Sequence, residues 1–417
     1  MIVLGVDIGG TFTDFVLFGG NELKVQKVLS TPHNPAEAVF DGIRSLGVSR
    51  NQTCIVHGST VATNTLLERK GAKVALITTN GYEDVIEIGR QTRSSLYDLF
   101  ICRESPLISQ ALRWGVMESV AATGEVVSGI KKSDLKKIST KLRRQGIESA
   151  AVCFLFSYKN PANEEAVMNE LQQSGIHVSA SCRILPEYRE YERFSTTVVN
   201  AYVSPVMSRY ITSLEDGLGT NNISIMQSNG GSVSTGNAKG KAVNCILSGP
   251  AGGVIGALEA AKLAGIKKII SFDMGGTSTD VSLCDGDIRL TTQTVVSGMP
   301  IKIPVIDMNT VGAGGGSLAY IDPGGALRVG PESAGADPGP VCYGKGEKIT
   351  VTDANLFLGR ISSEHFLGGR MKLETYIVSK CMKALAKKLG MTPVKAAEGI
   401  IDVANANMER AIKVISV

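Results

Sequence analysis

An eight-residue motif occurs twice in this chain and constrains its fold more than any other feature. Residues 7–14 read Asp-Ile-Gly-Gly-Thr-Phe-Thr-Asp and residues 273–280 read Asp-Met-Gly-Gly-Thr-Ser-Thr-Asp, so six of the eight positions are identical. An apolar, strand-like run precedes each copy and another follows it. Two copies of strand, glycine turn and strand predict two related α/β domains within one chain.

The length of the chain fits this duplication. With 417 residues it is too long for one compact core and fits two or three domains. We expect a first domain at 1–220, with an insertion at about 80–130 where the apolar periodicity is weak, a connecting segment at 221–268, and a second domain at 269–417.

Helical and strand-like segments alternate between the two motifs. Asn34, Pro35 and Gly47 provide the start and stop signals of a first helix, and Thr392 can cap a last helix that begins at Pro393. That last pattern runs into the apolar residues Val414 to Val417 without a polar stop, so we expect the natural polypeptide to continue. Further helices are expected at 60–70, 133–145, 162–174, 189–214, 250–264 and 375–389, and strands at 54–57, 74–78, 149–156 and 223–227.

Composition excludes several classes of protein. A net charge of +4 is small for this length and gives no reason to expect a nucleic-acid or membrane partner. The basic run from Lys131 to Arg144 has apolar residues at helical spacing, so its basic residues are interpreted as the solvent-exposed face of an amphipathic helix. The eight cysteines form no Cys-x-x-Cys pair and most lie in apolar runs, which indicates buried, reduced thiols. With no signal peptide or bilayer-length apolar stretch, we expect a cytoplasmic protein.

The repeated motif has the composition of a phosphate-binding turn. Glycines let backbone amides approach phosphate oxygens closely, because a Cβ atom would obstruct them, and threonines add hydroxyl donors. Two such hairpins facing each other across a cleft would hold the triphosphate of ATP from both sides. The predicted nucleotide-binding residues of the motif are Gly9, Gly10, Thr11, Thr13, Gly275, Gly276, Thr277 and Thr279.

Asp7 and Asp273 end the strands that precede the glycines, where carboxylates can hold Mg²⁺, usually through waters. We therefore predict them as the catalytic and metal-binding residues. The alternative is that each motif is only a tight glycine hairpin with a strand-end aspartate. The duplication, with an aspartate before and a threonine after both glycine pairs, favours the functional interpretation.

Five other polar residues are weaker candidates. His57 ends a strand and is a third catalytic candidate, although a lone strand-end histidine is more often structural. Arg90 and Arg93 could meet an anionic substrate or only solvent. Asp14 and Asp280 could support the metal site, but they fit better as hydrogen-bonding partners within the hairpins.

Two further glycine clusters could face a ligand. Gly312, Gly314 and Gly315 could approach the nucleotide from the second domain, although no helical pattern follows them, as a dinucleotide-binding loop would require. Gly249 to Gly253 opens a predicted helix, so its amides could bind an anion, but close packing explains these glycines almost as well.

These strings resemble a known family. The paired hairpins are similar to those of the actin, Hsp70 and sugar-kinase superfamily, which implies two ribonuclease H-like domains with an inserted subdomain. Within it, the chain resembles the hydantoinase A/5-oxoprolinase family, which includes N-methylhydantoinase and acetone carboxylase subunits. The resembling segments are Gly5 to Asp14, His57 to Asn64, Glu187 to Arg193, Asn200 to Tyr202, Ser248 to Gly253, 273–280, Val311 to Ser317 and Gly330 to Pro340.

The resemblance implies ATP- and Mg²⁺-dependent phosphorylation of a cyclic amide such as a hydantoin or 5-oxoproline, followed by hydrolysis. It also implies a hydantoinase B-like partner polypeptide, and a homodimer is left open. Family members continue past the equivalent of Glu409-Arg410 into another glycine-rich segment that contacts the adenosine, which this chain lacks. A ketone carboxylase subunit, a sugar- or carboxylate-kinase-like enzyme and an inactive nucleotide-binding fragment remain alternatives.

Overall fold

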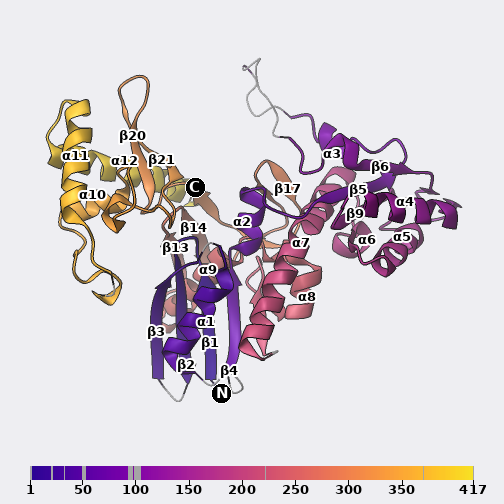
Figure 1. The fold of residues 1–417 in the computed structure, drawn as a ribbon, viewed down its shortest axis with the longest axis horizontal. Helices are drawn as coiled ribbons and strands as arrows, with labels where there is room; N and C mark the ends of the chain where they lie inside the picture. Colours follow the sequence, from indigo (N-terminus) through magenta and orange to yellow (C-terminus); the bar gives the residue numbers. More distant parts are fainter. Residues whose placement is uncertain are drawn as a thin grey trace.

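The computed structural model describes residues 2–19, 22–31, 33–48, 53–92, 97, 105–220, 222–369 and 371–416. It is a mixed α/β structure with two lobes that meet at the repeated motifs and a further sheet that projects to one side (Figure 1).

The first lobe is built on a six-stranded sheet in the order β12-β11-β4-β1-β2-β3. The first three strands along the chain form an antiparallel meander, and β4 and β11 run parallel to β1. Its strands are β1 (Ile2–Ile8), β2 (Phe12–Gly19), β3 (Glu22–Leu29), β4 (Thr53–Ser59), β11 (Ile223–Met226) and β12 (Ser232–Ser234). The segment that we expected to connect the domains thus begins with a strand of the first sheet.

One face of this sheet is buried beneath two helices. Leu4, Val6 and Phe15 point to this face and pack against α1 (Pro35–Leu46) and α7 (Glu190–Leu218). The aromatic ring of Phe15 occupies the place of a side chain at Gly42, where an added Cβ would meet the ring at 2.1 Å. This packing fixes the strand ends that carry the first motif, because the same strands continue into it.

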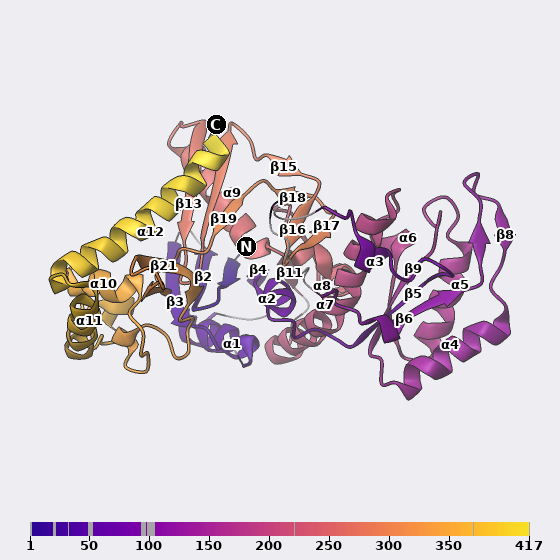
Figure 2. The ribbon, with the colours of Figure 1, turned by 90° about the horizontal axis from the view of Figure 1, so that it is seen from above.

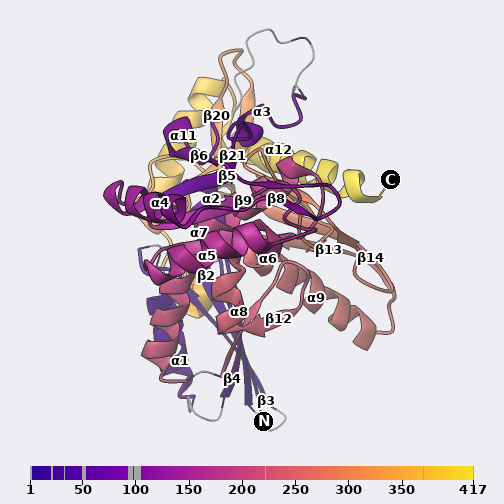
Figure 3. The same ribbon diagram turned by 90° about the vertical axis from the view of Figure 1, so that its right-hand side faces the viewer.

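The projecting domain is larger than the insertion expected at 80–130. It is a parallel sheet in the order β10-β9-β5-β6, whose strands come from residues 74–180 (Figure 1). Its strands are β5 (Val74–Thr79), β6 (Arg113–Val116), β9 (Ser149–Cys153) and β10 (His177–Ala180). The helices α4 (Lys132–Arg144) and α5 (Ala162–Gln173) cover one face, and Figure 3 shows both in the foreground.

The long helix α7 joins the projecting domain to the first lobe. Its first half packs on the other face of the β5–β9–β10 sheet, and its second half packs on α1 and the first sheet. Because the helix has partners on both sides, 19 of its residues, including Pro205, are buried. Several of the polar residues among them are hydrogen-bonded, such as Arg193 to the Phe154 carbonyl at 2.8 Å.

The second lobe repeats only the antiparallel part of the first sheet among the described residues. Its sheet has the order β13-β14-β19, and the strands are β13 (Lys268–Met274), β14 (Thr279–Asp285) and β19 (Asn309–Val311). The helix α12 (Pro393–Ser416) lies across β14 and β19, where Asn309 Nδ2 donates to the Ala411 carbonyl at 3.2 Å (Figure 2). As expected, Thr392 caps this helix, with its Oγ1 accepting from Lys395 N at 3.3 Å.

Two further parts complete the second lobe. The hairpins formed by β15 to β18 reach back to the first lobe, where Val296 and Ile301 join the core around α7. Beyond β19, the hairpin of β20 (Ser317–Ile321) and β21 (Leu327–Ser333) packs with α10 (Val351–Phe357), α11 (Thr375–Leu389) and α12 around a separate core. The ranges of the first pair of hairpins are β15 (Leu290–Thr291), β16 (Thr294–Val296), β17 (Met299–Ile301) and β18 (Val305–Ile306).

Candidate nucleotide site

The two motifs form hairpins with the same geometry. In the hairpin of β1 and β2, Gly9 N donates to the Phe12 carbonyl at 2.9 Å, and in that of β13 and β14, Gly275 N donates to the Ser278 carbonyl at 2.9 Å. We call these hairpin 1 and hairpin 2. Their strand registers also correspond, because each motif places its first and last aspartates opposite each other.

The tips of the two hairpins lie against each other, although they come from different lobes. A Cβ atom added at Gly276 would come within 2.4 Å of Thr11 Oγ1, and one added at Gly10 would lie 3.8 Å from Thr277 Oγ1. Glycine is therefore required at 276 by the close approach of the opposite hairpin. The repeated motif is one of the places where the two lobes meet.

Four carboxylates gather behind the tips. Asp7 and Asp14 are cross-strand neighbours in hairpin 1, as are Asp273 and Asp280 in hairpin 2. Partial desolvation, together with the Asp14 and Asp273 carboxylates, raises the pKa of Asp7 to about 6, against a smaller lowering by Lys27. Desolvation and Asp273 also raise the pKa of Asp280. Like charges this close repel each other, so the arrangement favours a bound cation.

The two outer aspartates have partners on the third strand of each sheet. Asp14 forms an ion pair with Lys27 of β3 at 2.9 Å, and Asp280 accepts from Thr310 Oγ1 of β19 at 2.5 Å. These contacts are of the kind expected for residues that support a hairpin. Asp7 and Asp273 have exposed side chains and remain the better candidates for ligand contact.

The carboxylates fit a magnesium ion that keeps water ligands better than a metal coordinated by protein side chains alone. Among the residues that the structure describes, no group of three or more His, Cys, Asp or Glu side chains is arranged to hold a metal. Mg²⁺ usually keeps several waters and is held by one or two carboxylates together with substrate phosphates. Asp7 and Asp273 would hold the ion, which would neutralise phosphate charge.

The predicted threonines divide into two pairs. Thr13 and Thr279 are fully buried, and their hydroxyls contact Ser30 Oγ at 3.0 Å and the Ala313 carbonyl at 2.5 Å. Thr11 and Thr277 lie at the tips, where Thr11 is 6% exposed and Thr277 is exposed. The hydroxyls of the first pair therefore hold the hairpins in shape, and the second pair is placed to contact a phosphate.

Ser30 is a supporting residue that the sequence analysis missed. Its hydroxyl donates to the Gly9 carbonyl at 2.8 Å, and its amide donates to the Thr11 carbonyl at 2.9 Å. It thus connects the end of β3 to both sides of hairpin 1. A lone serine at a strand end carries no sequence signal for this function, because the contact depends on how the meander folds.

The glycines after β19 give hairpin 2 an equivalent support. Gly315 N and Gly316 N donate to the Gly275 and Gly276 carbonyls at 3.0 and 2.6 Å. Gly314 N donates to Ser317 Oγ at 2.8 Å, and a Cβ on Gly314 would meet the hairpin backbone at 2.8 Å. The backbone amides of Gly314 and Gly315 are already hydrogen-bonded within the protein. Contact of Gly312, Gly314 and Gly315 with a nucleotide therefore stays a prediction, and at 314 and 315 it could not use the backbone amide.

His57 lies on the opposite face of the first sheet from Asp7. In the parallel register of β1 and β4, Gly58 is the neighbour of Asp7 and His57 is the neighbour of Val6, so alternation turns His57 toward α7. It is 1% exposed, and its Nδ1 and Nε2 lie 3.2 Å from the Val6 carbonyl and 2.6 Å from Tyr210 Oη. Burial lowers its pKa to about 4. The structure thus places His57 in the core, on the other face of the sheet from Asp7, so its catalytic role stays a prediction.

Arg90 is also engaged within the protein. Its Nη2 forms an ion pair with Glu192 Oε1 at 2.5 Å and lies 3.4 Å from Gln293 Oε1, which joins α7 to a hairpin of the second lobe. Arg93, the other predicted substrate-facing arginine, lies outside the described residues.

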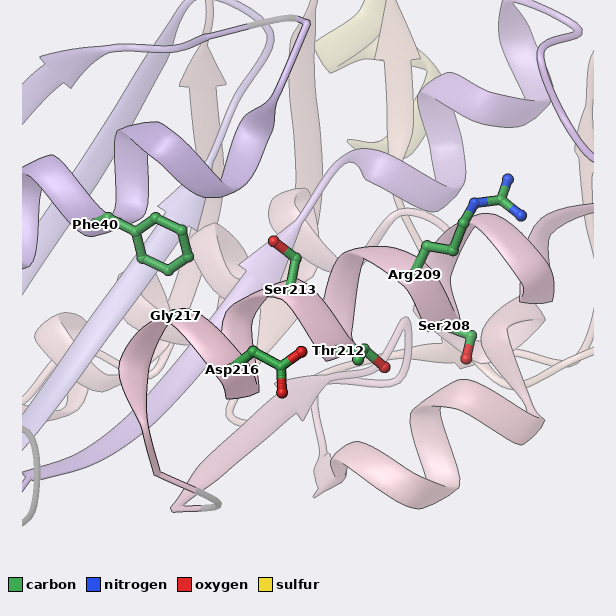
Figure 4. Close-up of a pocket in the computed structure, with 7 residues that line it drawn as sticks. All are labelled: Phe40, Ser208, Arg209, Thr212, Ser213, Asp216 and Gly217. Atoms are coloured by element: carbon green, nitrogen blue, oxygen red, sulfur yellow. The ribbon is translucent and has the colours of Figure 1, made fainter.

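A surface hollow lies between α1 and the second half of α7, away from both hairpins (Figure 4). Phe40, Arg209 and Asp216 line part of it, and the Phe40 ring covers Gly217. No residue of either motif contributes to its lining, so it does not coincide with the candidate site.

Comparisons with known proteins identify the family. Residues 3–175 match the hydantoinase/oxoprolinase N-terminal region, and residues 193–417 match the hydantoinase/oxoprolinase domain. The chain belongs to the hydantoinase/oxoprolinase family. The first of these matches contains hairpin 1 and the second contains hairpin 2, so the site is formed between two recognised regions of the family.

Its relatives include a caprolactamase subunit and a 5-oxoprolinase. The chain is 37% identical to caprolactamase subunit alpha of Pseudomonas jessenii, with 99% of this chain and 62% of the relative aligned. It is 36% identical to 5-oxoprolinase 1 of Arabidopsis thaliana, over 98% of this chain and 36% of the relative. An uncharacterised protein of Methanocaldococcus jannaschii is 40% identical, over 99% of this chain and 65% of its own length. The chain therefore spans less than two thirds of these relatives.

Two solved structures of the family share this fold. Acetone carboxylase in a nucleotide-free state superposes with a TM-score of 0.86 at 30% identity, over 99% of this chain and 62% of the other. ATP-dependent caprolactamase from Pseudomonas jessenii superposes with a TM-score of 0.80 at 36% identity, over 100% and 63%.

Across the described part of the chain, every helix is too short or too polar to cross a bilayer. The seven described cysteines are free, and four of them are buried, namely Cys153, Cys245, Cys284 and Cys342; Cys102 lies outside the described residues.

Proposed function

We propose that this chain is the nucleotide-binding part of an enzyme that uses ATP to phosphorylate a cyclic amide for ring-opening hydrolysis. The observation that carries the proposal is the contact between the tips of hairpins 1 and 2, with Asp7 and Asp273 behind them. Relatives named caprolactamase and 5-oxoprolinase support the choice of a cyclic amide.

The proposed reaction begins at the amide oxygen. That oxygen attacks the γ-phosphorus of ATP and forms a new oxygen–phosphorus bond. The bond between the γ-phosphorus and the β,γ-bridging oxygen breaks, and ADP leaves with its electron pair. The phosphorylated amide has lost its resonance stabilisation, so water can add to the carbon. The ring C–N bond then breaks, the nitrogen leaves as an amine after taking up a proton, and an acyl phosphate remains. A second water hydrolyses the acyl phosphate to the carboxylate and inorganic phosphate. The hairpins contribute by positioning the phosphates and neutralising their charge.

Each part of the site has a place in this scheme. The amides at Gly10 and Gly276 and the side chains of Thr11 and Thr277 would contact phosphate oxygens. Asp7 and Asp273 would hold the magnesium ion, whose charge favours transfer of the phosphoryl group. Hydrolysis would need a hydantoinase B-like polypeptide, in keeping with relatives that are named as subunits.

A ketone carboxylase subunit is the second candidate function. It is favoured by the structural match to acetone carboxylase and by 34% identity to the acetophenone carboxylase gamma subunit of Aromatoleum aromaticum. Both functions would use ATP to activate a carbonyl oxygen. They differ in the next step, which is hydrolysis by water for a cyclic amide and carboxylation for a ketone.

The experiment is an ADP-release assay with 5-oxoproline, hydantoin, caprolactam and acetone, each with and without a hydantoinase B-like polypeptide. We expect one of the cyclic amides to stimulate ADP release, with ring-opened product formed when the partner is present. The Asp7→Asn/Asp273→Asn double variant is the control and should lose the stimulation. Stimulation by acetone with bicarbonate alone would favour the second candidate, and no stimulation by any compound with the partner present would contradict both.

A further inference from the structure

One helix lies against both metal-site aspartates. The helix α9 (Ser248–Leu263) runs between the lobes, and two of its glycines lie one turn apart. A Cβ atom added at Gly249 would lie 3.2 Å from Asp7 Oδ1, and one added at Gly253 would lie 3.0 Å from Asp273 Oδ2. The two carboxylates therefore rest on the same helix, against glycines that are about 6 Å apart along its axis at 1.5 Å per residue.

The helix is attached to both lobes. At its start, Leu247 N donates to Thr63 Oγ1 at 2.9 Å, and Ser248 Oγ donates to the Ser59 carbonyl at 3.2 Å, which holds it to β4 and α2 (Val61–Leu67). Further along, Val254 and Leu258 pack in a small core with residues of the second lobe. If α9 shifted, its backbone would therefore change position relative to both carboxylates at once.

The glycines of α9 differ in their surroundings. Gly256 faces open space, with no atom within 4 Å of an added Cβ, and Gly252 faces only the side chain of Met226. Glycine in a helix interior is less stable than alanine by about 1 kcal/mol. Packing within the helix does not require glycine at 249 or 253, and the atoms closest to a Cβ at these positions are carboxylate oxygens.

We propose that α9 is a spacer that sets the positions of the Asp7 and Asp273 carboxylates for a shared divalent cation, and that Gly249 and Gly253 are positioning residues that leave room for them. This inference rests on the proposed function. It adds to the phosphate contacts of the hairpins a separate role for α9, which is to position the two carboxylates. Gly58 on β4 extends the same wall, because a Cβ there would lie 2.9 Å from Asp7 Oδ1.

A carboxylate can rotate away from a new methyl group more easily than a backbone can move. Alanine at 249 and 253 should therefore preserve the fold and raise helix stability, while it displaces the two carboxylates by a few tenths of an ångström. Displacing groups that orient a metal typically weakens its binding by about 10- to 100-fold. The expected signature is a protein that melts at the same or a higher temperature and binds the metal less tightly.

The test uses the full chain and Mn²⁺ as a paramagnetic probe, titrated in the presence of tripolyphosphate and followed by electron paramagnetic resonance. We expect Gly249→Ala/Gly253→Ala to weaken Mn²⁺ binding about tenfold without a lower melting temperature. The matched control, Gly256→Ala on the same helix, should bind Mn²⁺ as the unaltered protein does.

The outcomes separate this inference from the proposed function. Equal Mn²⁺ affinity of the double variant and the unaltered protein would overturn the spacer role alone, and so would an equal loss in Gly256→Ala. If the double variant melted at a much lower temperature, its glycines would be needed for packing, which also contradicts the inference. If the unaltered protein bound no Mn²⁺ with tripolyphosphate, the proposed function would fail and the spacer role would fail with it.

Discussion

Gly276→Ala should separate the two hairpins. The added Cβ would lie 2.4 Å from Thr11 Oγ1 and 3.2 Å from Thr11 Cβ, whereas ordinary contacts begin near 3.4 Å, so Thr11 must move by about 1 Å. Thr11 is 6% exposed and has little room to move. Overpacking of this kind costs about 1–3 kcal/mol in stability, and a misplacement of 1 Å in a catalytic site can cost about a hundredfold in rate.

The equivalent substitution in hairpin 1 is a matched control. Gly10→Ala would place its Cβ 3.8 Å from Thr277 Oγ1, an ordinary contact with an exposed residue, so it should leave the melting temperature nearly unchanged. Thr11→Ala should partly rescue Gly276→Ala, because it removes the atom at 2.4 Å and leaves the one at 3.2 Å.

The assay is MgATP binding by calorimetry beside thermal melting for the two single variants and the Thr11→Ala/Gly276→Ala double variant. We expect a lower melting temperature for Gly276→Ala only, with partial recovery of that temperature in the double variant, and at least about tenfold weaker MgATP binding by Gly276→Ala. Equal melting temperatures of Gly10→Ala and Gly276→Ala, or wild-type MgATP binding by Gly276→Ala, would refute the contact between the tips.

Three further predictions concern titration and support. Burial lowers the pKa of His57 from 6.5 to about 4, so between these pH values the imidazole takes up a proton in the unfolded chain but not in the folded protein. The free energy of unfolding should therefore fall by about 3 kcal/mol as the pH drops from 7 to 4. Urea titrations should show a smaller fall for His57→Gln. Because the folded-state pKa of Asp7 is raised from 3.8 to about 6, its stability contribution is complete below pH 4 and lost as pH rises through 6. Asp7→Asn should therefore raise the free energy of unfolding at pH 8 without Mg²⁺, by no more than about 1 kcal/mol because the residue is exposed, and should raise the melting temperature with it. An unchanged or lower value would contradict the crowding of the carboxylates. Ser30→Ala leaves the Thr13 hydroxyl and the Gly9 carbonyl without their partner and should cost about 1–3 kcal/mol in chemical denaturation, whereas Ser362→Ala, an exposed control, should not.

Local signals in the sequence predicted much of the secondary structure. The helix with Pro35 at its start ends at Gly47 in the left-handed conformation, with φ of 65°, as a glycine stop requires. Asn34, however, makes no side-chain capping bond to that helix. The repeat predicted two hairpins of the same geometry, because identical strands and turns adopt the same local structure, and both form.

The tertiary context decided what the sequence could not. The projecting sheet assembles strands from widely separated parts of residues 74–180, so weak periodicity around 80–130 concealed its extent. The direction of His57 depended on the register of β1 and β4, which no local pattern encodes. The glycines at 314–316 are compatible with either a ligand or a neighbouring backbone, and only their contacts with hairpin 2 distinguish the two.

The central claim is that both hairpins hold the phosphates of one nucleotide. Its most direct test is calorimetric titration of MgATP into the protein with and without saturating magnesium tripolyphosphate. We expect binding at millimolar MgATP or below, and competitive loss of that binding when tripolyphosphate is present, because the hairpins contact phosphate groups. MgATP binding that tripolyphosphate leaves unchanged, or no binding at millimolar MgATP, would contradict the claim.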